Sequence, residues 1–157
     1  GLEQGIKDIY ALMEQIAGQI GAGSLEPAPG YVALETLYNM AENASVALSY
    51  AYEGSGANIL DYAAAAQAAT DSFNVKKGGY NVMPVTASAV LRMNRYGRLA
   101  EDAFARGDYA NSYAYNLLAR EFAGAAEAIS ASETPKFIGV MVNVVPTQAT
   151  GEAGYVN

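Results

Sequence analysis

The chain has 157 residues and a mass of 16.4 kDa, carries a formal net charge of −7, and contains no Cys, His or Trp. The length predicts one domain with a core of its own, and the missing residue types exclude disulfide frameworks, thiolate metal centres and every nucleophilic triad that depends on His or Cys. Charged residues make up only 16% of a chain that is 52% hydrophobic and has 12 Tyr, which indicates that much of the surface contacts other protein.

The N-terminal half contains three predicted amphipathic helices. Over residues 2–20, apolar side chains recur at spacings of three and four, the period of one helix face; they are Leu2, Ile6, Ile9, Met13, Ile16 and Ile20. A Gly- and Pro-rich stretch at 21–30 is expected to be a linker. The same spacing predicts a second helix over about 31–53 and a third over about 58–72.

Two later segments have the pattern of β-strands. A short hairpin is expected over 73–83, because residues 73–75 and 80–82 flank the turn-forming stretch Lys76-Lys77-Gly78-Gly79. Residues 136–145 are rich in β-branched side chains and predict a strand with one face made by Ile138, Val140, Val142 and Val144. A strand that is apolar on both faces needs cover on both sides and a backbone partner, which the hairpin or a neighbouring subunit would provide.

Two more helices are predicted, over about 86–106 and 109–131, with a turn at Gly107-Asp108 between them. The expected fold is therefore mainly α: a bundle of about five helices with a small β element, made by the hairpin 73–83 and the C-terminal strand 136–145. Residues 1–135 form the bundle, and residues 136–157 form the strand and a polar tail, in the same domain or exchanged with a neighbouring subunit.

Positive charge gathers in the middle of an acidic chain. Residues 1–75 have nine acidic residues and one Lys, hence −8, whereas residues 76–120 have seven basic and three acidic residues, hence +4. Arg92, Arg95 and Arg98 recur every three residues and lie close to one helix face. They are candidates to clamp phosphate or an acidic neighbour, and the alternative is a solvated helix face that pairs with Glu101, Asp102 and other local acids. The net negative charge disfavours general binding of polyanions.

Tyr side chains are the second candidate contact surface. Tyr31, Tyr38 and Tyr52 are separated by multiples of seven and share one side of the second predicted helix. Tyr packs in cores and interfaces while its hydroxyl stays at the rim, and a surface for stacking bases or sugars is the alternative. No cofactor or metal site is predicted, and no catalytic constellation is found in the sequence, so an enzyme is not expected.

Two resemblances bear on these alternatives. Residues 96–124 resemble a single tetratricopeptide hairpin, on the basis of Tyr96, Leu99, Ala100, Gly107-Asp108-Tyr109 and Ala119, and depart from that pattern at Ala103, Asn116 and Gly124. One copy of the repeat implies a generic helical hairpin. The Ala- and Tyr-rich chain that ends in residues 154–157, Gly-Tyr-Val-Asn, is similar to coat proteins of archaeal filamentous viruses, which implies a coat that meets DNA.

These features predict a non-enzymatic structural protein that self-assembles into a filament, coat or surface layer by helix packing and exchange of the C-terminal strand. Its expected partners are other copies of itself, outside the cell or in a virion, and no segment is expected to span a membrane. The alternatives are a virion coat protein that wraps nucleic acid through the three Arg residues, and a monomeric helical module that binds a peptide or small ligand. The candidate interface consists of Arg92, Arg95, Arg98, Tyr31, Tyr38, Tyr52, Ile138, Val140, Val142 and Val144.

Overall fold

The computed structural model describes residues 1–55, 62–81 and 83–144, with side chains up to residue 131. It is mainly helical, as the sequence predicts. The described part of the chain contains five α-helices and one short 3-10 turn: α1 (Leu2–Ala22), α2 (Pro27–Ser55), α3 (Ala63–Lys76), η2 (Pro84–Thr86), α4 (Ala87–Ala105) and α5 (Tyr109–Val144). The predicted helix over 58–72 begins in residues that lie outside the described ranges.

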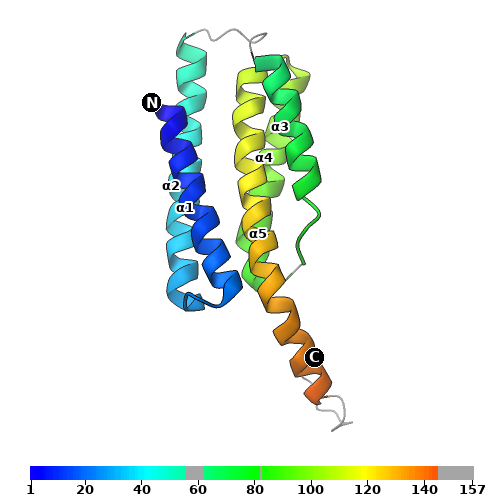
Figure 1. Cartoon of the computed structure of the whole chain (residues 1–157). Helices are drawn as coiled ribbons and strands as arrows, with labels where there is room; N and C mark the ends of the chain where they lie inside the picture. The colour runs from blue at the N-terminus through cyan, green and yellow to red at the C-terminus, as the bar shows by residue number, and fades with distance from the viewer. Residues whose placement is uncertain (56–61, 82, 145–157) are drawn as a thin grey trace.

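The helices form two antiparallel hairpins and one single helix. α1 and α2 run side by side in opposite directions, as do α4 and α5, and α3 packs along α5 (Figure 1). α5 contacts all four other α-helices and is therefore the central element.

The core lies around α5 and is filled by side chains from every α-helix. Phe122 is fully buried, and the ring of Tyr38 meets it edge-on at a centroid distance of 5.2 Å. Many of the buried positions of α5 are small, and these small side chains allow several helices to approach the central one. They are Ala110, Ala114, Ala119, Ala123, Ala125 and Ala126.

The turn between α1 and α2 is shorter than the expected linker over 21–30. Gly23 ends α1 at φ 78°, where a residue without a Cβ is favoured, and its N–H donates to Ile20 O (3.1 Å). α2 then begins at Pro27, which suits a first helical position because the missing N–H would have no partner there. A Cβ on Gly30 would lie 2.7 Å from Ile20 Cγ1, so the two helices approach closely at this end.

The hairpin expected over 73–83 is not found, and no strand occurs in the described ranges. Phe73–Lys76 form the last turn of α3 instead, and the N–H of Lys77 donates to Phe73 O (2.9 Å). The reason is burial: Phe73 follows Ala66 and Ala69 at spacings of seven and four, so a longer helix carries its ring onto the same buried face.

The strand expected over 136–145 is also not found. Residues 136–144 continue α5 as helix, while residues 145–157, with the polar tail, lie outside the described ranges. Because no hairpin is present, a strand here would leave its N–H and C=O groups unpaired, whereas a helix pairs them within the segment. Figure 1 shows this last part of α5 extending past the end of the bundle.

Candidate functional site

Arg92 lies at the centre of a polar network between α2 and α4. Its Nη1 donates to Glu35 Oε1 (3.1 Å), its Nη2 donates to Asn39 Oδ1 (2.9 Å), and its Nε pairs with Glu42. The guanidinium also lies 5.2 Å from the centroid of the Tyr38 ring. Burial alone would lower the pKa of Arg92, but the hydrogen bonds to Glu42 and Glu35 raise it above its ordinary value.

Glu42 gathers two further donors from α4. Arg95 Nη1 lies 3.3 Å from Glu42 Oε1, and the hydroxyl of Tyr96 donates to the same oxygen (3.1 Å). Burial raises the pKa of Tyr96 to about 12, and the charge of Glu42 acts in the same direction. Two of the three candidate Arg residues are thus paired within the chain, with acids of α2 instead of the local Glu101 and Asp102.

Arg98 is separated from this network. An α-helix advances by about 100° per residue, so three residues fall about 60° short of a full turn and a stripe with that spacing rotates around the helix. Arg98 accordingly lines a cleft between α3 and α4. In the described part of the chain it forms no ion pair.

The candidate Tyr residues lie largely inside the bundle. Tyr38 is 3% exposed and Tyr52 is 8% exposed, and Tyr31 is half-buried against the same core. The hydroxyl of Tyr52 donates to Glu3 Oε2 (2.8 Å), and burial followed by this bond raises the pKa of Tyr52. These positions correspond to the core-packing interpretation of the Tyr spacing, so they offer little surface to a partner.

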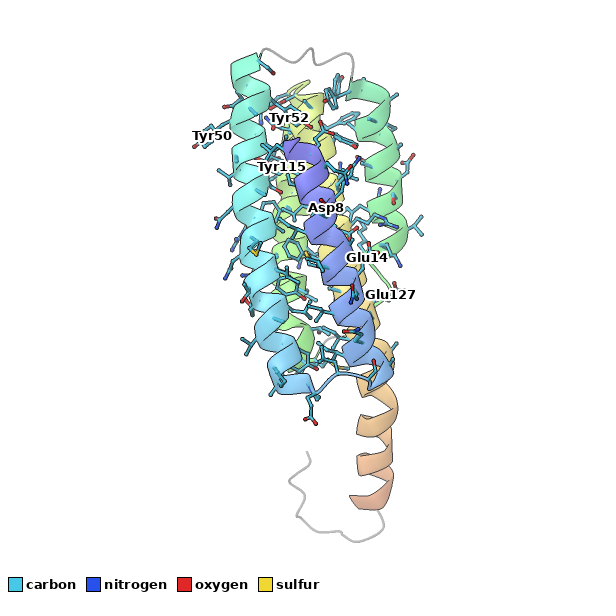
Figure 2. All side chains as sticks on the ribbon, turned by 60° about the vertical axis from the view of Figure 1, so that its left-hand side comes forward. Asp8, Glu14, Tyr50, Tyr52, Tyr115 and Glu127 are labelled. Carbon is cyan, nitrogen blue, oxygen red and sulfur yellow. The ribbon has the colours of Figure 1, made fainter. Side chains whose placement is uncertain are left out.

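The outward side of α2 has a different character. We use the name α2 outer face for its exposed residues from 32 to 51, none of which is charged: Val32, Thr36, Asn39, Met40, Asn43, Val46, Ala47, Tyr50 and Ala51. Val32 is 68% exposed and Tyr50 is 70% exposed, and Figure 2 shows Tyr50 pointing away from the bundle. The sequence indicates this surface. Glu35, Glu42 and Glu53 are separated by seven and eleven residues, so they lie together on one side of the helix and leave the α2 outer face without charge.

The four remaining candidates, Ile138, Val140, Val142 and Val144, belong to the projecting part of α5. On a helix they no longer share one face, because alternate residues are about 200° apart. Six of the nine residues from 136 to 144 are apolar. A helix that is apolar on all sides is normally buried in protein or membrane.

The described ranges hold neither a metal-binding cluster nor a membrane-spanning helix. They contain no group of three or more His, Cys, Asp or Glu that would hold a metal ion. In the same ranges, no helix combines the length and the apolar character needed to cross a bilayer.

Comparison with known proteins gave no relative. No protein-family model, no curated protein and no solved structure matches the chain significantly. The fold and the surfaces define the class as a helical bundle with an uncharged outer face on α2 and a projecting apolar C-terminal helix.

Proposed function

We propose that the chain is a non-enzymatic structural protein that self-assembles into a filament, coat or surface layer. The observation that supports this most is the α2 outer face, where all nine exposed residues are uncharged in a chain of net charge −7. A helix that faces water normally carries charged side chains on its outer side. Contiguous uncharged surfaces with exposed apolar and Tyr side chains are typical of protein–protein contacts.

The partner of this face is a second copy of the chain. Its projecting segment, residues 136–144, is apolar on most positions and needs cover, and the α2 outer face offers an uncharged surface to cover it. The segment is about 13 Å long and the face from Val32 to Tyr50 is about 27 Å long, at 1.5 Å per residue, so the segment fits on the face.

Contact between two different surfaces sets the form of the assembly. When the end of one copy packs on the side of the next, the interface is heterologous, and repetition gives rings or open filaments. The segment acts as a packed helix in this arrangement. Exchange of residues 136–144 as a strand is the second route to assembly, and the β-branched composition of this segment favours it. Strand exchange would be recognised by β-type circular dichroism that appears only in the assembled protein.

Wrapping of nucleic acid by a virion coat is the less supported alternative. Arg92 and Arg95 are already neutralised by Glu35 and Glu42, so phosphate contacts would first have to break these pairs. Affinity for phosphate depends on free Lys and Arg and falls steeply with salt.

The proposed location of the assembled form is outside the cell or in a virion.

Substitution on the α2 outer face tests the proposal. Tyr50→Asp and Val46→Asp each introduce a charge where two copies meet, and we expect each to shift assembly to at least about tenfold higher protein concentration, because an unpaired charge is costly to bury. Val75→Asp is the matched control, since Val75 is 85% exposed on α3 and outside the face. Assembly that responds equally to all three substitutions would contradict the proposal.

A further inference from the structure

A cleft of about 380 Å³ opens between α3 and α4, with α5 at its floor. This volume lies in the range of pockets that hold small molecules. The cleft is independent of the proposed assembly surface, since the residues that line it belong to α3, α4, α5 and the first residue after α3.

The floor of the cleft presents a fixed hydrogen-bond acceptor. Asn116 on α5 is 3% exposed, and its Nδ2 donates to Thr70 Oγ1 (2.8 Å) and weakly to Ser112 Oγ (3.5 Å). These bonds hold the amide in one orientation. Its Oδ1 accepts no hydrogen bond from the part of the chain that the structure describes, so this oxygen is available to a donor in the cleft.

Two aromatic rings give the cleft apolar walls. Phe73 is 8% exposed, and a Cβ on Gly97 would lie 3.0 Å from its ring, so α4 packs directly against it. Phe104 lines the cleft about two turns after Gly97 on α4. The walls are therefore formed by packed side chains on two helices, which favours a preformed site.

Three charged side chains around the cleft have no charged partner. Lys77, Arg98 and Glu101 form no ion pair within the described ranges, although Lys77 lies 5.7 Å from the centroid of the Phe73 ring. The other five basic residues between 76 and 120 all pair with acids: Lys76, Arg92, Arg95, Arg106 and Arg120. In this region, unpaired positive charge is thus confined to the cleft, and an unpaired carboxylate lies beside it.

We infer that this cleft binds a small amino-acid zwitterion, on the basis of the two unpaired cations, the unpaired carboxylate and the oriented Asn116 amide in one cavity. The ligand carboxylate lies near Arg98 and Lys77, because a guanidinium matches a carboxylate with two parallel hydrogen bonds. The ligand ammonium lies near Glu101 and Asn116 Oδ1, and its side chain lies against the two Phe rings.

Ligands with a single charge fit this arrangement less well. A plain carboxylate would leave Glu101 unpaired next to a second negative charge, and a plain amine would be repelled by Lys77 and Arg98. A zwitterion is the ligand type that gives every charged group in the cleft an opposite charge. Its apolar side chain also displaces water from the aromatic walls.

Calorimetric titration of the full chain with L-phenylalanine at pH 7 tests this inference. We expect saturable binding below about 10 mM. 3-Phenylpropionate, which lacks the ammonium, and phenethylamine, which lacks the carboxylate, are expected to bind at least about tenfold more weakly, since hydrogen bonds to charged groups are each worth roughly a factor of ten or more. Absence of saturation, or equal binding of 3-phenylpropionate and L-phenylalanine, overturns the inference.

Two variants locate the site. Arg98→Gln and Glu101→Gln should each weaken binding of L-phenylalanine at least about tenfold, while Arg106→Gln, a matched control whose residue pairs with Asp108 outside the cleft, should leave it unchanged. Helical circular dichroism shows whether each variant is folded. If Arg98→Gln does not fold, the binding measured for Glu101→Gln tests the inference. Unchanged binding in a folded cleft variant places the ligand elsewhere and overturns the inference.

Discussion

Arg92 on α4 and Glu42 on α2 form an ion pair across two helices, although they lie 50 residues apart in the chain. Their side chains are 14% and 17% exposed, so water screens the pair poorly. The pair therefore joins the acidic N-terminal half of the chain to its basic middle.

Removal of one partner of this pair should destabilise the fold. Arg92→Met leaves Glu42 largely buried with only Arg95 and the Tyr96 hydroxyl beside it, and we expect the free energy of unfolding to fall by about 2–4 kcal/mol. Urea denaturation at pH 7 measures this. Arg95→Met is the control: Arg95 is 50% exposed, so its loss should cost less than about 1 kcal/mol. Equal losses in the two variants would contradict this description of the network.

Glu121 should make stability depend on pH. It is 7% exposed on α5, and burial raises its pKa to about 8, with hydrogen bonding to Glu14 of α1 acting in the same direction. The ion pair with Arg120 (3.2 Å) opposes this rise without cancelling it. Because the folded state favours the protonated carboxyl, Glu121 stabilises the fold most below pH 4.5, and this contribution is lost as pH rises to about 8.

The substitution Glu121→Gln tests this sign. Its amide stays neutral, so the variant should unfold at a higher temperature than the natural chain at pH 8, with a gain of at least about 1 kcal/mol, and the difference should vanish near pH 4. Glu127→Gln is a control on the same helix, since the Glu127 side chain is 40% exposed. A variant that is less stable than the natural chain at pH 8 would show that the fold favours the ionised carboxylate of Glu121 and does not raise its pKa.

Phe122 should be among the side chains on which the core depends most. It is fully buried on the central helix between the rings of Tyr38 and Tyr96. Phe122→Ala should lower the free energy of unfolding by about 3–5 kcal/mol, because it loses apolar burial and leaves a cavity. Val75→Ala at an exposed position should change it by less than about 0.5 kcal/mol. Denaturant midpoints for the two variants give this comparison directly.

Removal of residues 136–157 should abolish assembly without unfolding the bundle. The buried residues of the described core end at Ser130, so the truncated chain keeps its core packing. We expect an unchanged thermal midpoint and a soluble helical monomer in sedimentation experiments. Assemblies that persist unchanged after truncation would show that the C-terminal segment takes no part in them.

Hydrophobic periodicity was sufficient to locate several helices. The spacing of three and four predicts residues 2–20 as a helix, and the structure has Leu2–Ala22. Capping and turn residues predict a helix over about 86–106, and the structure has Ala87–Ala105. These helices pack one apolar side on a core, so local pattern and tertiary burial agree. The expected start of α2 at residue 31 is late, because Pro27 and Pro29 have the pattern of a linker, although Pro is also favoured in a first helical turn.

Local pattern failed where distant contacts decide the structure. Phe73 belongs to α3 because its ring is buried against Gly97, 24 positions later in the chain. The turn-forming pair Gly78-Gly79 therefore follows the end of a helix and does not join two strands. The partner of Arg92 could not be predicted either, because spacing places a side chain on a helix face without identifying the helix that it meets. The lack of charge on the α2 outer face, in contrast, could be deduced from the sequence once the helix was assumed.

The mass of the full chain by light scattering, over concentrations from about 1 to 100 μM at pH 7, tests the proposed self-assembly most directly. The proposal predicts species far above 16.4 kDa even at low concentration, and a return toward 16.4 kDa in Tyr50→Asp. A mass of 16.4 kDa over the whole range would contradict self-assembly.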